Sequence, residues 1–111
     1  MGRIYFSNWM VMVNEASDFN ETSDPISVGV THTQSIQIQW SEGAEDGEVI
    51  VECADTKTFT GTWAELKRIP FAGENRLDLD QHDGPCNFIR TRITKVIPGG
   101  TVTTKIQCLK G

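Results

Sequence analysis

The chain has 111 residues, with 38% hydrophobic and 23% charged residues, a composition typical of one folded domain rather than a disordered chain. Its net charge of -5 and pI of about 4.9 disfavour nucleic-acid binding. The longest apolar run, Met10 to Val13, is far shorter than the roughly 20 residues of a membrane-spanning helix, so we expect a single domain over residues 1–111 that does not enter a membrane.

Residues 1–13 are apolar at positions that would lie on both faces of a strand, unlike an ordinary surface strand of an antiparallel sheet. They form either a strand of the sandwich or an arm that docks on a neighbouring subunit. The stretch has no small-residue cleavage site of a signal peptide, so we expect no export signal and no glycosylation of the sequon at Asn20. The acidic residues 14–25 are expected to form a polar linker to a core over residues 26–111.

Residues 33–40 read T-Q-S-I-Q-I-Q-W, which places Ile36, Ile38 and Trp40 on one face of a strand. A polar turn over residues 41–47 precedes a second alternating segment over residues 48–53. The two segments are expected to form a hairpin and to bury Trp40 in the core.

Two short strands are expected next, around residues 63–66 and around Leu77 and Leu79. Residues 87–96 and 101–109 alternate again on either side of a Pro-Gly-Gly turn, which predicts a second hairpin. The inward faces are expected to carry Ile89, Thr91 and Ile93 in one strand and alternate residues from Val102 to Cys108 in the other. Seven or eight short strands without a helical stripe predict an all-β fold, an antiparallel jelly-roll-like β-sandwich.

The charges are divided unequally along the chain. Residues 1–55 hold ten acidic residues against one basic residue, whereas residues 56–111 hold nine basic residues against five acidic ones. If folding separates these charges, copies of the chain or a dipolar partner would attract one another; interleaved strands would instead cancel them.

The three cysteines, Cys53, Cys86 and Cys108, are an odd number and contain no C-x-x-C pair. We expect neither a disulfide framework nor a zinc site, and predict free thiols, with Cys53 and Cys108 as small buried side chains in strands.

No catalytic motif with diagnostic spacing is present, so we expect no enzyme activity, no cofactor and no metal. His32 and His82 are far apart and are expected at the surface. The acids of residues 78–84 resemble a calcium loop only loosely, because the third acid is one position late. Trp9 and Trp63 leave carbohydrate recognition open as an alternative, since exposed aromatic rings stack on sugars.

Four motifs follow one another from Gly47 onward. They are Gly47-Glu-Val-Ile-Val-Glu-Cys-Ala-Asp55, Thr62-Trp-Ala-Glu-Leu66, Asn87-Phe-Ile-Arg-Thr-Arg-Ile-Thr94 and Gly100-Thr-Val-Thr103.

This order of motifs over residues 47–111 resembles small β-sandwich proteins of tailed-phage virions. With its length, acidity and apolar N-terminal segment, the chain looks most similar to the jelly-roll staple proteins that decorate capsids of epsilon-fifteen-type phages. The resemblance implies a structural protein on the capsid exterior, assembled in the bacterial host cytoplasm, that clamps adjacent major capsid subunits. The alternative function is a carbohydrate-binding or tail-associated adhesion module.

The expected partners are the major capsid protein and neighbouring copies of this chain, with no nucleic acid, membrane or small-molecule substrate. A lattice clamp needs no pocket, because weak contacts add up over many copies. The predicted interface combines the N-terminal segment with one face of a later strand. Its residues are Ile4, Tyr5, Phe6, Trp9, Met10, Met12, Arg90 and Arg92.

Overall fold

The computed structural model describes residues 5–6, 9–28, 33–73, 76–83 and 86–110, and the side chains of residues 5, 6, 109 and 110 are not described. The described residues form strands and loops, and they contain no helix that could cross a membrane. The strands are β1 (Tyr5–Phe6), β2 (Met10–Val11), β3 (Ile26–Ser27), β4 (Thr33–Trp40), β5 (Glu48–Ala54), β6 (Ala64–Pro70), β7 (Leu77–Asp83), β8 (Phe88–Lys95) and β9 (Val102–Lys110).

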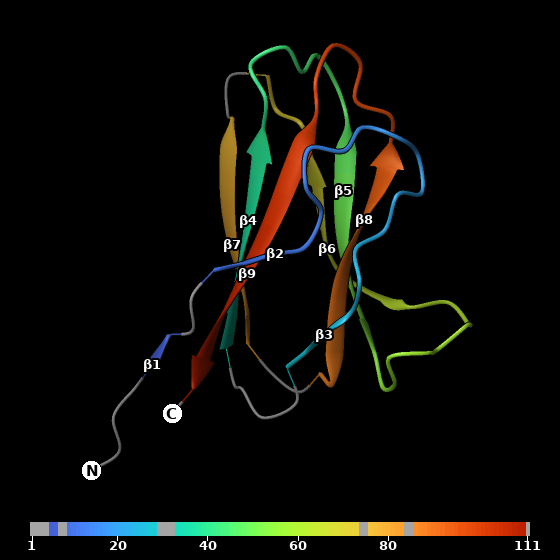
Figure 1. The fold of residues 1–111 in the computed structure, drawn as a ribbon, viewed down its shortest axis with the longest axis vertical. Coiled ribbons are helices and arrows are strands. Elements are labelled where there is room, and N and C mark those ends of the chain that lie inside the picture. Colours follow the sequence, from blue (N-terminus) through green and yellow to red (C-terminus); the bar gives the residue numbers. More distant parts are fainter. Residues whose placement is uncertain (1–4, 7–8, 29–32, 74–75, 84–85, 111) are drawn as a thin grey trace.

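These strands form two antiparallel sheets that face each other (Figure 1). Sheet 1 has the order β1-β9-β4-β7, with β2 also paired to β9, and sheet 2 has the order β3-β8-β5-β6. Among the described strands, only β1–β2 and β5–β6 are consecutive strands of one sheet, and after β2, β3, β4, β6, β7 and β8 the chain crosses to the other sheet, as in the jelly-roll form of the β-sandwich. The predicted all-β, jelly-roll-like sandwich is confirmed.

Both predicted hairpins are wrong. Strands β4 and β5 lie in different sheets, and so do β8 and β9. An alternating pattern shows which face of a strand is buried, but it fits a partner across the sandwich as well as a partner in the same sheet. The two loops that cross here pack together, since a Cβ atom on Gly43 would lie 2.1 Å from the carbonyl oxygen of Gly99.

The N-terminal segment lies along one lateral edge of the sandwich. Its backbone bonds first to β9, with Met12 N donating to Thr104 O at 2.8 Å, and then to β8, with Ser23 N donating to Thr91 O at 2.9 Å. The corner between these stretches falls at Glu15 and Asn20, which have positive φ angles of 48° and 65°. Residues 14–25, expected as a linker, therefore pass from the edge of sheet 1 to the edge of sheet 2.

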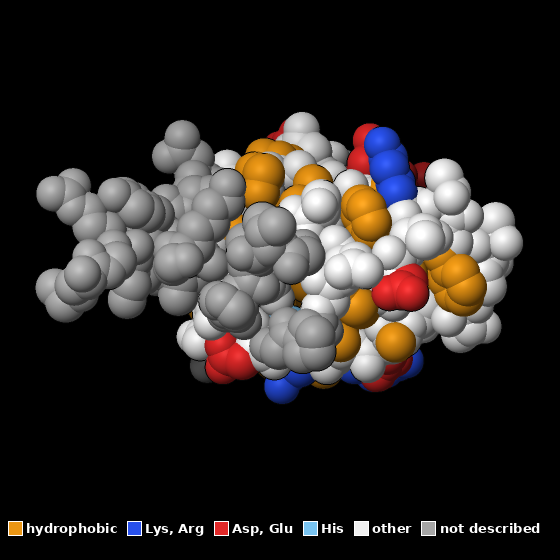
Figure 2. All heavy atoms as spheres, turned by 90° about the horizontal axis from the view of Figure 1, so that it is seen from below, with side chains coloured by type: hydrophobic (Ala, Val, Ile, Leu, Met, Phe, Trp, Pro, Cys, Tyr) orange, Lys and Arg blue, Asp and Glu red, His pale blue; other side chains and the backbone are white. Residues whose placement is uncertain are grey.

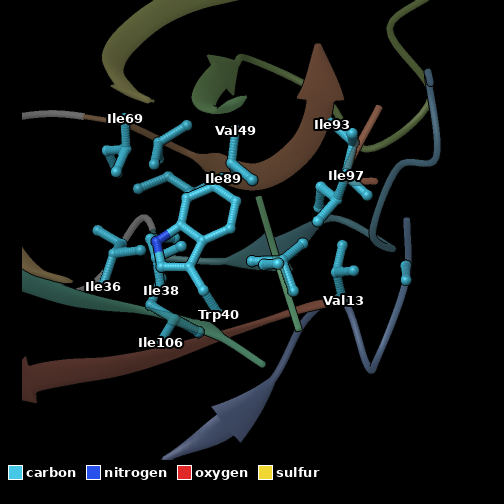
Figure 3. Close-up of a cluster of buried hydrophobic side chains, with 14 of the residues drawn as sticks. Val13, Ile36, Ile38, Trp40, Val49, Ile69, Ile89, Ile93, Ile97 and Ile106 are labelled. Carbon is cyan, nitrogen blue, oxygen red and sulfur yellow. The ribbon is translucent and has the colours of Figure 1, made fainter. Parts of the chain in front are cut away.

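The core lies between the sheets, with Trp40 at its centre (Figure 3). Ile36, Ile38 and Trp40 are buried, as their spacing predicts, and Ile89 and Ile93 face them from sheet 2. Burying such side chains stabilises the fold by about 1.5–3 kcal/mol each.

A pair of threonine hydroxyls joins the sheets inside this core. Thr91 Oγ1 and Thr104 Oγ1 lie 2.7 Å apart, and Thr104 Oγ1 also accepts a hydrogen bond from Val13 N at 2.9 Å. Both threonines are fully buried, so these bonds satisfy polar groups that water cannot reach.

The prediction of three free thiols is also wrong. Cys53 at the end of β5 forms a disulfide with Cys86, just before β8, whereas Cys108 is buried and forms no disulfide. Strands β5 and β8 are neighbours in sheet 2, with Cys53 opposite Ile89, and this pairing brings together two cysteines separated by 33 positions.

Strand β7 has an inverted pattern for a sandwich strand. Leu77 and Leu79 point outward and are exposed, whereas Asp78 and Asp80 share the inward face of Ile38 and Ile36. The strand is at the edge of sheet 1, and inward-pointing charges at an edge oppose pairing with further strands.

Candidate functional site

The exposed residues that could contact a partner lie on the outer faces of the two sheets. The outer face of sheet 1 is nearly uncharged. On its described strands it carries serine, threonine, glutamine and leucine, with Lys105 in the middle and Asp83 at one end. The remaining described residues that β4, β7 and β9 contribute to this face are Thr33, Ser35, Gln37, Gln39, Leu77, Leu79, Gln81, Thr103 and Gln107.

Apolar side chains are exposed on this same face. Leu79 is 67% exposed and Trp9 39% exposed, and Leu77 and Val11 are about half exposed. Trp9 lies over β4 and β7, where it shares a shallow hollow of about 330 Å³ with Ser35, Leu79, Asp80 and Gln81. Four of the seven large apolar side chains exposed in the described residues therefore lie on one face of the sandwich.

The outer face of sheet 2 is organised by charge instead. Glu52 in β5 is only 3% exposed, and its carboxylate accepts hydrogen bonds from the Nε atoms of Arg90 at 3.0 Å and Arg92 at 3.1 Å. Arg92 also donates to Glu52 Oε2 at 3.3 Å and to Asn20 Oδ1 at 2.9 Å. A buried carboxylate is stable only when it is paired in this way.

Arg90 makes a second contact that fixes its position. Its guanidinium lies over the ring of Trp63, 4.1 Å from the ring centre, which is cation–π geometry. The indole of Trp63 is held from the other end, because its Nε1 donates to Phe59 O at 3.0 Å. An open hollow of about 400 Å³, called the Arg90 hollow below, lies beside Arg90 and Trp63. Its lining residues are Asn20, Thr22, Glu52, Gly61, Thr62, Trp63, Arg90 and Arg92.

A second ionic cluster lies on the same face of sheet 2. Arg68 in β6 donates to Glu48 and Glu65, and these two carboxylates raise its pKa above the ordinary arginine value. Ile50, opposite both Arg68 and Arg92, is buried beneath the long arginine stems.

The structure separates the predicted interface residues into several places. Trp9 lies on the outer face of sheet 1, whereas Arg90 and Arg92 lie on the outer face of sheet 2. Met10 and Met12 are half-buried against the core. The backbone of Tyr5 and Phe6 pairs with the end of β9, their side chains are outside the described part, and Ile4 is outside the described residues altogether.

Glu52 was not predicted as a site residue. The signal for it was a glutamate in the middle of the apolar segment Val49 to Cys53, followed 38 positions later by two arginines one residue apart. The pairing of β5 with β8 that joins them cannot be deduced from either segment alone.

The three aspartates of the loose calcium-loop resemblance have separate partners. Asp78 accepts a hydrogen bond from Trp40 Nε1, Asp80 pairs with Lys67, and Asp83 accepts one from Thr33. Within the described residues, no group of three histidine, cysteine, aspartate or glutamate side chains is placed to share a metal ion. His82 bonds to the buried Gln34 at 2.8 Å, and His32 lies outside the described residues.

The end of the sandwich seen in Figure 2 presents a different surface. There the described hydrophobic side chains form separate small patches among polar atoms, and the charged side chains lie mostly around the rim. In this view, no broad apolar surface is visible among the described side chains.

Comparison with known proteins finds similarity in structure but not in sequence. No protein-family model matches the chain, and no curated protein matches it in sequence. Among solved structures, the crystal structure of the SPBc2 prophage-derived protein YomS is similar, with a TM-score of 0.67 and 11% sequence identity. The similarity covers 99% of this chain and 97% of that one, so the two share their whole fold.

Proposed function

We propose that this protein is a structural protein of a tailed-phage virion that binds the outside of the capsid and clamps adjacent major capsid subunits. The observation that carries the proposal is the outer face of sheet 1, a surface with few charges on which Trp9 and Leu79 are exposed. Exposed apolar side chains gathered on one face mark surfaces that contact other proteins.

Two further observations support this function. The fold is that of a prophage-derived protein over its full length, and jelly rolls are common among viral capsid proteins. The Cys53–Cys86 disulfide suits a protein that works outside the cell, since disulfides persist in oxidising surroundings.

The N-terminal strands β1 and β2 also fit this proposal. Strand β2 borders the outer face of sheet 1, and β1 pairs with the far end of β9 (Figure 1). Strand β1 pairs with β9 over only two residues, so contact with a capsid subunit or a second copy would add to the few bonds that hold it. The proposed partners are the major capsid protein and neighbouring copies, and no catalytic step is assigned to the protein.

The test is co-sedimentation of the purified protein with capsids assembled without it. We expect Leu79→Lys to weaken binding by about tenfold or more, because it places a charge in the contact surface. Val96→Lys is the matched control, since Val96 is also an exposed apolar residue, at 53%, but lies in the loop between β8 and β9. Equal binding by both variants would contradict the proposed surface.

The carbohydrate-binding alternative rests on Trp9 alone. Trp63 is only 4% exposed and is covered by Arg90, so its ring offers no free face to a sugar. Trp9 is exposed beside the polar side chains of Ser35 and Gln81. Binding on a glycan array that Trp9→Ala abolishes would favour this alternative over the capsid clamp.

A further inference from the structure

The Arg90 hollow on sheet 2 lies on the opposite side of the molecule from the proposed capsid-binding face. It contains two arginines and one glutamate, so its lining has one surplus positive charge. The two arginines differ in how many of their donors already have partners.

Arg92 is largely occupied. Its Nε and Nη2 bond to Glu52 and its Nη1 bonds to Asn20. Arg90 differs, because only its Nε bonds to Glu52, and none of the described residues accepts a hydrogen bond from its Nη1 or Nη2. Arg90 therefore keeps the two terminal nitrogens of its guanidinium for a ligand.

The free end of Arg90 is also held in place before any ligand arrives. Glu52 fixes it from beneath, and the ring of Trp63 fixes the plane of the guanidinium. A donor that is already oriented loses little conformational entropy on binding. Two parallel N–H groups in this arrangement match the two oxygens of a carboxylate.

The rest of the hollow adds compatible groups. Asn20 uses its Oδ1 for Arg92, which leaves its amide Nδ2 as a donor, and Thr62 adds a hydroxyl to the lining. The hollow is open and larger than one acidic side chain, so a side chain on a projecting segment of another protein can enter it.

We propose that Arg90 anchors a carboxylate-binding site that takes an aspartate or glutamate side chain of a partner protein. The covered ring of Trp63 argues against a sugar, as it leaves no aromatic platform. The proposal does not depend on capsid binding, since it concerns a different face of the sandwich.

The test is an NMR titration of the full, 15N-labelled chain at constant ionic strength. The probes are the blocked peptide acetyl-Glu-Glu-Glu-amide, its glutamine counterpart and glucuronate, and the signals are the Trp63 indole N–H and the arginine Nε–H groups. We expect a saturable shift with the glutamate peptide and none with the glutamine peptide.

Arg90→Gln should lower the affinity for the glutamate peptide by about tenfold, because one charge-assisted pair is lost. Arg68→Gln is the matched control, because Arg68 lies on the same face but both of its terminal nitrogens are bonded to glutamates, and it should leave affinity within about twofold. Arg90→Lys, which keeps the charge beside Glu52, tests the fork geometry and should also weaken binding. Absence of a saturable shift, equal weakening by Arg90→Gln and Arg68→Gln, or tighter binding of glucuronate than of the peptide would each overturn the proposal.

Discussion

The outer faces of the two sheets are both turned away from the core, but they carry different kinds of side chain. Sheet 2 pairs its charges: Arg90 and Arg92 enclose Glu52, and Arg68 joins Glu48 to Glu65. Sheet 1 carries neutral amides and hydroxyls with exposed leucines and one central lysine.

The difference indicates where each face finds its partners. Most charges on sheet 2 are satisfied within the molecule, apart from the free end of Arg90. The apolar groups on sheet 1 remain exposed to water, and burying them against another protein would be favourable. The same contrast extends to the cysteines, since the disulfide fastens sheet 2 whereas the thiol of Cys108 is buried in sheet 1.

The largest effect should come from the disulfide of sheet 2. Replacing Cys53 and Cys86 by alanine should lower the free energy of unfolding by about 3.5 kcal/mol, the chain-entropy value for a loop of this length. Urea unfolding measures it, and a reductant should lower the stability of the wild-type protein by a similar amount. Cys108→Ala in sheet 1 should cost about 1 kcal/mol and leave the response to reductant unchanged.

Removing the buried carboxylate of sheet 2 should cost nearly as much. Glu52→Gln leaves Arg90 and Arg92 without their common counterion, and we expect a loss of about 3 kcal/mol by urea unfolding. Gln39→Ala, on the exposed outer face of sheet 1, should change stability by less than about 0.5 kcal/mol. Similar losses for the two variants would remove the energetic distinction between the faces.

The polar contact between the sheets should rank third. Thr104→Val leaves the hydroxyl of Thr91 and the backbone N–H of Val13 without a buried partner, at an expected cost of about 2 kcal/mol. Thr103→Val is the control on the opposite face of the same strand, where an exposed hydroxyl accepts from Glu15 N at 3.1 Å. Its cost should be about 0.5 kcal/mol, because water can replace that bond. A smaller loss for Thr104→Val than for Thr103→Val would contradict this account.

The sequence predicts the buried face of each strand better than the neighbour of each strand. The alternation from Ile36 to Trp40 correctly identifies core residues, because side chains alternate strictly along a strand. It does not show which strands pair with β4, since that depends on how the chain crosses the sandwich. Strand β7 is an exception even for the buried face, because its apolar Leu77 and Leu79 are exposed and its inward face carries Asp78 and Asp80.

The candidate sites were predictable only in part. Arg90 and Arg92 stood out in the sequence, as did Trp9, but their placement on opposite sheets depends on β8 and β2 joining different sheets. Glu52, Trp63 and Asn20 come together from three distant segments through strand pairing and a long loop. Such contacts between distant residues leave no periodic pattern in one sequence.

The smallest expected effects concern two exposed carboxylates, one associated with each sheet. The hydrogen bond from Lys95, the last residue of β8, and then that from Gly47 N hold the pKa of Asp46 below its ordinary value of 3.8. Hydrogen bonds from Thr33 and Gln81 hold the pKa of Asp83 in sheet 1 below the same value. A depressed carboxylate pKa contributes stability that is present above pH 3.8 and is lost as the pH falls through the folded pKa.

The causes of these two pKa shifts can be separated by NMR titration of the carboxyl carbons. Lys95→Met should raise the pKa of Asp46 towards 3.8 and leave that of Asp83 unchanged, whereas Thr33→Val should do the reverse. Added salt should weaken the shift of Asp46 more than that of Asp83, because salt screens an exposed ion pair but not a hydrogen bond from a neutral hydroxyl. Equal screening of both shifts would mean that Asp46, beside sheet 2, and Asp83, in sheet 1, do not differ in being held by a charged and by a neutral partner.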